Sequence, residues 1–197
     1  MNIKSNIAKS KLNRKKTFNK ITIPRGFVLI SDTREQKPLF NPIPEKLIQG
    51  ELIVITKTLK HGDYSIKGFE DQICIERKQA SDFHSYIGKE REKTSKKLYA
   101  MNDMFFKALV IELQFVWRTY TCYKCKQKIR VRTPQNIYDT VISSSWTTIT
   151  VNQIDSFIKE CEVKHNMHVF WTPDRELLQR YVLTRLVFAY KKVRELT

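Results

Sequence analysis

The sequence contains no long apolar stretch. No run of hydrophobic residues approaches the roughly 20 that a helix needs to span a bilayer, which excludes an integral membrane protein. The amino terminus is basic but lacks the apolar core of a signal peptide. Only four cysteines occur in 197 residues, and they are too scattered for a disulfide framework. A reducing compartment is therefore expected: the cytoplasm of a prokaryote or of a virus-infected host cell, or the nucleus of a eukaryote.

Acidic residues are scarce beside basic ones. The chain has 20 Asp and Glu against 36 Lys and Arg, which gives a formal charge of +16. A domain this basic usually binds a polyanion, and nucleic acid is the most common one. With 41% hydrophobic residues, the chain can still bury one sizeable core, which we expect in residues 21–197.

Residues 1–20 contain no acid and few large apolar side chains, so they predict a flexible basic arm. Two interpretations of this arm stay open. It either contacts phosphates by releasing counterions or is simply a solvated tail. Its cations are Lys4, Lys9, Lys11, Arg14, Lys15, Lys16 and Lys20.

Short apolar runs alternate with helical patterns, which predicts an α/β fold. Strands are expected at 27–31, 52–56, 64–66, 72–78, 108–111 and 168–171. Helices are expected at 44–48, 80–101 and 152–165, and a last helix is expected to have Thr172 as its N-cap. The last helix carries apolar residues at helical spacing, which form a core face or a partner face and make a homodimer possible.

Residues 115–133 interrupt this alternation with a basic insertion that predicts a hairpin. Its tip carries Cys122 and Cys125 in a C-x2-C pattern. A structural zinc ion needs four ligands, which Cys161 and His165 could complete. The alternative is a plain basic insertion without metal.

Acidic residues cluster where strands are expected to end. Asp32, Arg34 and Glu35 follow the first apolar run, and open α/β sheets place their sites at such carboxyl ends. Gly62 and Asp63 then form a turn into the third expected strand.

The strand at 72–78 ends with Glu76, Arg77 and Lys78. Because side chains alternate along a strand, Glu76 and Lys78 share one face, and Arg77 lies on the other with Ile73 and Ile75. A carboxylate and an ammonium on one face can together hold a metal ion and a water molecule.

We expect four carboxylates to meet near this strand: Asp32, Glu35, Asp63 and Glu76. Two bare carboxylates about 4 Å apart repel by about 4 kcal/mol at an effective dielectric constant near 20. A divalent ion would remove this repulsion, and oxygen ligands favour Mg²⁺ or Mn²⁺. Such an ion would promote phosphodiester hydrolysis, with Lys78 orienting the attacking water.

These residues follow the pattern GD-x12-ERK-x3-D, which ends at Asp82. The pattern resembles the nuclease domain of the XPF-type structure-specific endonucleases, in a compact form like the stand-alone versions of prokaryotes and their viruses. The resemblance covers most of residues 26–190. It includes Arg91, Leu98-Tyr99, the run from Leu109 to Glu112 and Val169-Phe170-Trp171.

The resemblance implies a restriction-endonuclease-like α/β fold of the PD-(D/E)XK type, with a central mixed sheet flanked by helices. It also implies cleavage of DNA with Mg²⁺ or Mn²⁺. Asp63 and Glu76 would be the principal metal ligands, with Asp32 and Glu35 completing the cluster, and Lys78 would be the catalytic lysine.

The remaining expected roles concern DNA. Arg34 and Arg77 would contact phosphate or hold the acids in place, so Arg77 also counts among the catalytic residues. Lys89 and Arg91 lie on the basic side of the expected helix 80–101, which either binds DNA or is a solvated face. Asp82, at the start of the expected helix 80–101, would favour the helix N-terminus and orient a basic neighbour rather than bind the metal ion.

The leading hypothesis is a metal-dependent DNA endonuclease, for which family analogy suggests branched, flap or fork DNA in repair, recombination or replication. Two alternatives remain. One is an inactive nuclease-like subunit, and the other is a basic DNA- or RNA-binding module without chemistry. The second alternative does not explain why acids would stand in a phosphate-binding cleft, where they repel DNA unless a metal ion intervenes.

Overall fold

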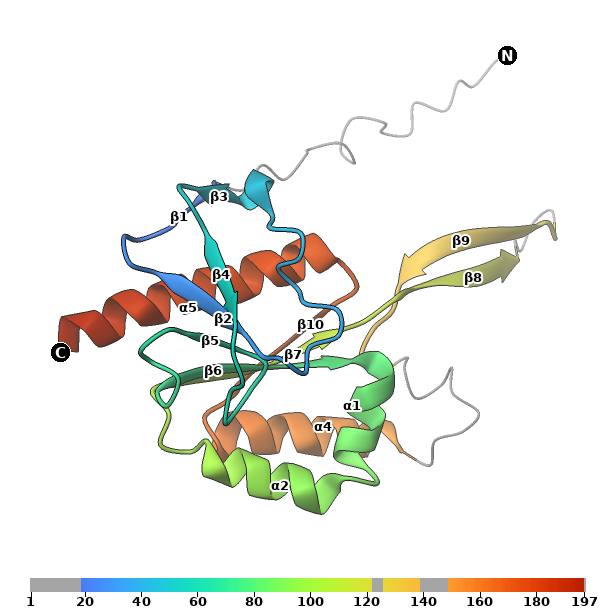
Figure 1. The fold of residues 1–197 in the computed structure, drawn as a ribbon. Helices are drawn as coiled ribbons and strands as arrows, with labels where there is room; N and C mark the ends of the chain where they lie inside the picture. Colours follow the sequence, from blue (N-terminus) through green and yellow to red (C-terminus); the bar gives the residue numbers. More distant parts are fainter. Residues whose placement is uncertain (1–18, 122–125, 139–148, 197) are drawn as a thin grey trace, which may run out of the picture.

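A six-stranded mixed sheet forms the centre of the protein, as a computed structural model shows for residues 19–121, 126–138 and 149–196 (Figure 1). Its strand order is β10-β7-β6-β5-β2-β4. In chain order the strands are β2 (Val28–Ser31), β4 (Ile53–Thr56), β5 (Tyr64–Ile66), β6 (Ile73–Gln79), β7 (Phe106–Glu112) and β10 (His168–Thr172). The expected α/β fold with a mixed sheet is confirmed.

Strand β6 occupies a central place. It pairs in parallel with β7 along its whole length and antiparallel with β5 on its other side. Its side chains alternate as expected, since Ile73 and Ile75 belong to one hydrophobic cluster and Cys74 to another.

Helices cover both faces of the sheet (Figure 1). On one face lies the long helix α5 (Arg175–Leu196), whose Leu178, Val182 and Leu186 are buried against the sheet. On the other face lie α1 (Ala80–Ile87), α2 (Arg91–Ala100) and α4 (Val151–Lys159), the last continued by a π-helical segment at Glu160–Lys164. The apolar side of α5 is thus used within the chain, and homodimerisation stays a prediction.

The single helix predicted over 80–101 is wrong, because the chain breaks into α1 and α2 at Gly88. A glycine inside a helix costs about 1 kcal/mol relative to alanine, and the break offers other partners for the backbone. The Glu90 N–H donates to the carbonyl of Ser85 at 2.8 Å, and the Thr94 hydroxyl donates to the carbonyl of Tyr86 at 2.7 Å. The turn places α2 beside β6.

The helix predicted at 44–48 is also shorter than expected. A single 3₁₀ turn, η1, spans Glu45–Leu47, and Ile48 already belongs to β3 (Ile48–Gln49). This strand pairs in parallel with β1 (Ile21–Thr22), so pairing with a distant segment replaces a further helical turn.

Helix α5 is capped by Asp174 rather than by the expected Thr172. The Asp174 carboxylate accepts hydrogen bonds from the N–H groups of Glu176 and Leu177, at 3.0 and 3.1 Å. Thr172 remains in β10, where it pairs with Glu112, and its hydroxyl accepts from the Asp174 N–H.

The basic insertion forms the predicted hairpin, which projects from the body of the protein (Figure 1). Strand β8 (Phe115–Thr121) pairs antiparallel with β9 (Lys128–Pro134), and neither joins the central sheet. Within the described residues, no helix is long and apolar enough to cross a membrane. Both described cysteines, Cys74 and Cys161, are buried thiols outside any disulfide.

Candidate active site

The Gly62-Asp63 turn brings β5 against β6. Gly62 has φ = +72°, and a Cβ atom at this position would lie 2.9 Å from the carbonyl oxygen of Ile75, so only glycine fits. The Asp63 N–H donates to that same carbonyl at 2.8 Å. The turn therefore fixes Asp63 directly beside the strand that carries Glu76.

Asp63 lies in a position that disfavours its charged form. Its Oδ2 accepts a 2.6 Å hydrogen bond from the backbone N–H of Arg77. Burial, together with the nearby charges of Glu76 and Glu35, nevertheless raises the pKa of Asp63 to about 7. A carboxyl with this pKa is poised between its protonated form and a form that can bind a cation.

Glu76 is fully buried, and two lysines neutralise it. The Lys97 ammonium of α2 lies 2.5 Å from Oε2, and the Lys78 ammonium lies 2.7 Å from Oε1. Burial would raise the pKa of Glu76, but the charges of Lys97 and Lys78 outweigh it and hold this pKa below its ordinary value. Apart from this ion pair with Lys78, Oε1 has no hydrogen-bond partner among the described residues.

Lys78 stands on the same face of β6 as Glu76, as the sequence predicts, and lies 4.9 Å from the centre of the Tyr86 ring. Burial would lower the pKa of Lys78, but Glu76, Asp63 and Asp82 raise it above the ordinary value. The ammonium is therefore charged at neutral pH and suited to stabilise negative charge.

Asp32 is occupied by the chain itself. Its Oδ1 accepts from the backbone N–H and the Nε of Arg34, and its Oδ2 accepts from Arg34 Nη2 and from the backbone N–H of Leu59 at 2.7 Å. Burial would raise the pKa of Asp32, but these bonds hold it below the ordinary value. The arrangement fixes Arg34, whose guanidinium also donates to the carbonyl of Leu59.

Arg77 lies on the opposite face of β6, and its buried guanidinium joins two acids. Nη1 lies 2.8 Å from Glu35, and Nη2 donates to Glu112 at the end of β7. Glu112 also pairs with Arg175 of α5 at 3.0 Å. Glu35 accepts in addition from the Tyr64 hydroxyl at 3.0 Å. This network ties the ends of two central strands to α5.

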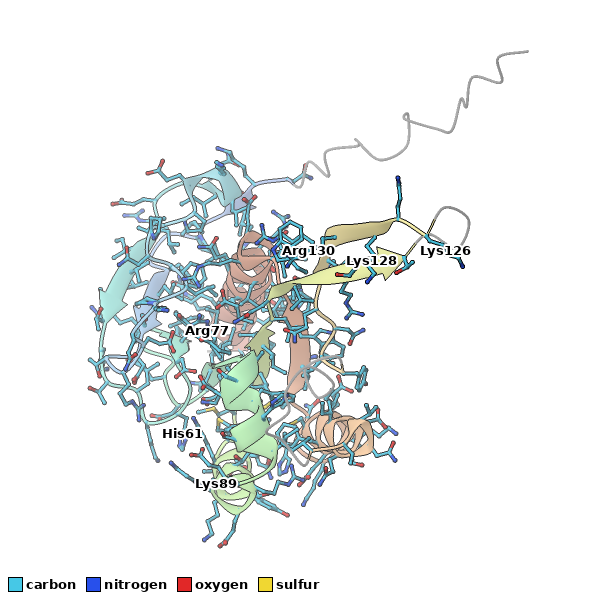
Figure 2. The ribbon with its side chains drawn as sticks, turned by 90° about the vertical axis from the view of Figure 1, so that its right-hand side faces the viewer. His61, Arg77, Lys89, Lys126, Lys128 and Arg130 are labelled. Atoms are coloured by element: carbon cyan, nitrogen blue, oxygen red, sulfur yellow. The ribbon has the colours of Figure 1, made fainter. Side chains whose placement is uncertain are left out.

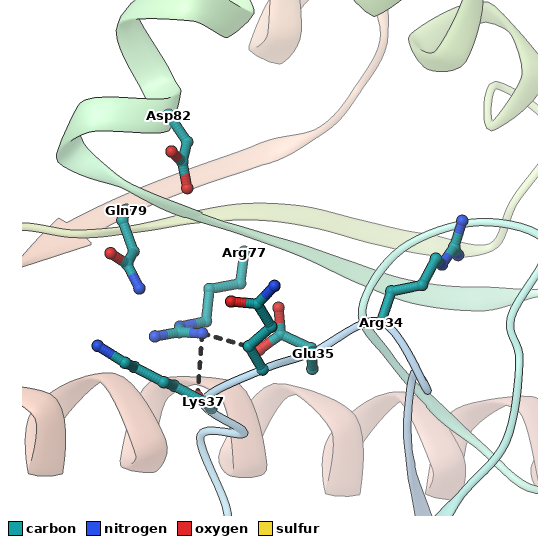
Figure 3. A pocket seen from close by; sticks show the side chains of 7 residues that line it. Arg34, Glu35, Lys37, Arg77, Gln79 and Asp82 are labelled. Atoms are coloured by element: carbon teal, nitrogen blue, oxygen red, sulfur yellow. Dashed lines mark hydrogen bonds and ion pairs between the residues drawn. The ribbon is translucent and has the colours of Figure 1, made fainter.

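A polar pocket of about 390 Å³ opens beside the network (Figure 3). Its wall combines the paired Arg77 and Glu35 with the exposed Arg34 and Lys37. The other lining residues are Gln36, Gln79 and Asp82. Cations and amide groups around an open pocket suit the oxygens of a phosphate.

Within the described ranges, no three His, Cys, Asp or Glu side chains form a group that could hold a metal ion. The four expected carboxylates are instead divided: Asp63 lies close enough to Glu76 for their charges to interact, Asp32 is bonded to Arg34, and Glu35 to Arg77. The pair Asp63 and Glu76 still fits a divalent cation, because both are oxygen donors and Oε1 of Glu76 is buried without a hydrogen bond.

The two cations expected on the helical face have different surroundings. Arg91 pairs with Glu160 and covers the ring of Phe157 at 4.8 Å, so it joins α2 to α4. Lys89 is exposed at the turn between α1 and α2, below Arg77 in the view of Figure 2.

The proposed zinc ligands Cys122 and Cys125 lie outside the described residues. The other two candidates are buried, and the Nδ1 of His165 lies 2.8 Å from the Asn102 side chain.

Two residues that pair with site residues were not identified from the sequence: Lys97, which pairs with Glu76, and Glu112, which pairs with Arg77. Lys97 is one of the cations on the basic side of the expected helix 80–101, which was expected either to bind DNA or to be a solvated face, and Glu112 was expected only as the end of an apolar strand. The sole local signal was an acid at the carboxyl end of a buried strand, since the pairing partners are distant in sequence.

A mixed sheet with helices on both faces, and with Asp63, Glu76 and Lys78 close together at its centre, is the restriction-endonuclease-like arrangement that the resemblance implies. The chain belongs to the ERCC4 domain family, whose family model matches residues 31–184. The resemblance inferred from the GD-x12-ERK-x3-D pattern is thereby confirmed.

Two solved structures are similar to this chain. XPF from Aeropyrum pernix has a TM-score of 0.51 and 16% identity over 81% of this chain, which covers 59% of that structure. XPF from Aeropyrum pernix in a complex with DNA has a TM-score of 0.49 and 18% identity, with coverages of 84% and 66%. At this identity the first likeness shows a shared fold. Curated proteins gave no match.

Proposed function

We propose that the chain is a divalent-metal-dependent DNA endonuclease that hydrolyses phosphodiester bonds. The observation that carries this proposal is the buried Glu76 beside Lys78, with the protonatable Asp63 across the neighbouring strand. Burying a carboxylate together with two lysines costs desolvation free energy that an apolar residue would avoid, which favours a chemical role for Glu76.

Asp63 and Glu76 would hold the ion, and Mg²⁺ or Mn²⁺ fits their oxygen donors. When bound, the ion would polarise a phosphoryl oxygen and lower the pKa of a water molecule. Lys78, on the same face of β6 as Glu76, would orient that water and stabilise the negative charge that develops on the phosphate.

The other expected residues would position the substrate. Asp32 would act by fixing Arg34, and Glu35 by fixing Arg77, rather than as direct ligands, because both Asp32 oxygens and Oε2 of Glu35 already accept hydrogen bonds from these arginines. Arg34, Lys37 and Gln79 around the pocket would then contact the phosphates that flank the cut.

The protein would act as one nuclease domain over residues 21–197, with residues 1–20 as a basic arm and residues 115–133 as a basic insertion. Its substrate would be branched, flap or fork DNA, as the family resemblance suggests, in a compartment that contains DNA. Repair, recombination or replication would be the setting for such cleavage.

A cleavage panel of duplex, flap and fork DNA tests the proposal with Mg²⁺ and with Mn²⁺. The wild type should incise at least one form, and Glu76→Gln and Lys78→Ala should each reduce the rate by about 100-fold or more. Glu92→Gln and Lys93→Ala, exposed residues of α2, serve as matched controls and should retain the rate. No incision by the wild type with either metal would overturn the enzyme proposal.

A further inference from the structure

The β8–β9 hairpin rises from the edge of the candidate active site. Its base is fixed by hydrogen bonds from Leu113 N–H to the Thr172 carbonyl and from Gln135 N–H to the Gln114 carbonyl, at 3.0 and 2.9 Å. Gln114, the residue before β8, lines a second pocket of about 190 Å³ together with Arg77 and Glu112. The hairpin is therefore continuous with the polar surface around Arg77.

The two pockets share part of their walls, namely Lys37, Arg77 and Gln79. A polar path thus leads from Arg34 to the base of the hairpin. A strand of DNA that passes the pocket on this side meets the hairpin next.

The hairpin carries only positive charge, since residues 113–138 contain no Asp or Glu. Its described cations are Arg118, Lys126, Lys128, Arg130 and Arg132. Figure 2 shows Arg130, Lys128 and Lys126 in succession along the projecting strand and its tip. A polyanion complements this surface, whereas a basic protein would be repelled by it.

One face of the hairpin combines these cations with aromatic rings. Trp117 pairs directly with Arg132, and Thr119 with Arg130, so these side chains project on the same side as Phe115 and Lys128. The guanidinium of Arg130 lies 5.6 Å from the Trp117 ring, and that of Arg132 lies 5.0 Å from the Phe115 ring. We call the four residues Phe115, Trp117, Arg130 and Arg132 the aromatic–arginine face.

This face is exposed although it includes large rings. Trp117 is 60% exposed and Phe115 is 41% exposed. A two-stranded ribbon without a core is marginally stable by itself, and its arginine–aromatic pairs contribute only about 0.5–1 kcal/mol each while the rings stay exposed at a cost in solubility. Their arrangement therefore indicates a ligand.

Unpaired DNA fits the aromatic–arginine face better than duplex DNA does. Aromatic rings stack on bases whose faces are accessible, which is the case in single strands, while arginines hold the phosphates between them. Residues two apart on a strand lie about 6.7 Å from each other, about twice the 3.4 Å stacking distance of bases. Phe115 and Trp117 can therefore each stack on one of two successive bases when the unpaired strand is extended to this spacing.

We propose that the aromatic–arginine face binds an unpaired strand of the DNA substrate beside the cut, and that it thereby selects branched over simple duplex DNA. That the DNA is cut beside this bound strand rests on the proposed nuclease function. The binding itself is measured without cleavage.

The test measures affinity in EDTA for two fluorescent DNAs: a fork with two thymidine arms and a duplex of the same base-pair count. Phe115→Ala/Trp117→Ala should weaken binding of the fork by about 30-fold or more and binding of the duplex by less than about 3-fold. The matched control is Tyr120→Ala, which removes a ring that is 50% exposed on the other face of β8 and should change neither affinity by more than about 3-fold.

A second measurement addresses contact directly. The fluorescence of Trp117, taken as the difference between the wild type and Trp117→Phe, should be quenched when the fork binds, because a base stacks on the indole. Equal losses for fork and duplex, an equal loss for Tyr120→Ala, or no quenching would each overturn the inference. These outcomes are independent of nuclease activity, because a protein that binds forks in this way but cuts no DNA would overturn only the proposed function.

Discussion

Lys97 stands at the centre of the charge balance around Glu76, although it lies 21 residues further along the chain. Two ammonium groups share one buried carboxylate, so the site is already neutralised before any divalent ion binds. An ion that binds Glu76 must displace at least one of them. Lys97 is a candidate for this exchange, because its side chain is one-third exposed and can swing into solvent.

Replacing Lys97 with methionine should therefore destabilise the protein without metal. Leaving Oε2 of Glu76 unpaired costs about 1–2 kcal/mol, which lowers Tm by about 2–8 °C. Mn²⁺ should raise Tm more in Lys97→Met than in the wild type, because the ion takes over the role of the missing cation. Thermal unfolding in EDTA and in Mn²⁺ measures both effects.

The matched control is Lys96→Met, since Lys96 is exposed and pairs only with the exposed Glu92 among the described residues. Its Tm should change by about 1 °C or less. Similar shifts in both variants, or the same response to Mn²⁺, would contradict the assigned role of Lys97.

The raised pKa of Asp63 predicts that metal binding depends on pH. Its pKa is raised to about 7, so the folded protein holds this proton more tightly than the unfolded chain does. The resulting stabilisation is complete below the ordinary pKa of 3.8 and is lost as the pH rises through about 7. A metal ion must displace the same proton, so affinity should fall about tenfold per pH unit below 7.

Calorimetry in two buffers of different ionisation enthalpy counts the protons released when Mn²⁺ binds. About one proton should be released at pH 6 and nearly none at pH 8. His61, whose pKa is lowered by burial, is the neighbouring group that could mimic this result. The variant His61→Gln should leave the proton count unchanged, and a count independent of pH would rule out Asp63 as the proton donor.

At the scale of elements, the turn between β4 and β5 decides where Asp63 lies. Gly62→Ala should destabilise the protein by about 2–4 kcal/mol, because it adds a clash with the Ile75 carbonyl to the strain of a positive φ. Chemical denaturation gives the free energy of unfolding, and metal binding should weaken in parallel because Asp63 moves.

Gly68 provides the matched control. It also has a positive φ, +86°, but a Cβ atom there would have no neighbour within 4 Å. Gly68→Ala should therefore cost only the strain, about 1–2 kcal/mol, and leave metal binding intact. If both variants lose the same stability and the same metal affinity, the close packing of Gly62 on β6 is not what positions Asp63.

The local sequence predicted some of the secondary-structure elements and not others. The six strands of the central sheet were predictable because apolar runs are bounded by turn residues such as Gly62 and Asp63. The break between α1 and α2 was not, since one glycine is too weak a signal against a long helical pattern. The Thr94 hydroxyl donates a hydrogen bond to the Tyr86 carbonyl of α1, and this bond can form only once the two helices are packed together.

At the scale of the whole molecule, the net charge of +16 should govern DNA affinity. Residues 1–18, which lie outside the described residues, supply six cations and no acid. Removing them should weaken binding of all DNA forms alike and make the slope of log affinity against log salt shallower by up to about 5.

Fluorescence anisotropy over a range of salt concentrations measures this slope. An arm with the same residues in scrambled order should restore it, because counterion release depends on charge and not on sequence. An unchanged slope after truncation would show that the arm is only a solvated tail.

The sequence by itself determined the sheet, the family and the order of the site residues, because strand periodicity and the spacing of Gly62, Asp63, Glu76 and Lys78 are local properties. Only the tertiary structure decided how the charges are shared. Lys97 reaches Glu76 from α2, and Glu112 reaches Arg77 from β7, because packing brings distant segments together. Such pairings depend on the approach of whole elements, which no short stretch of sequence encodes.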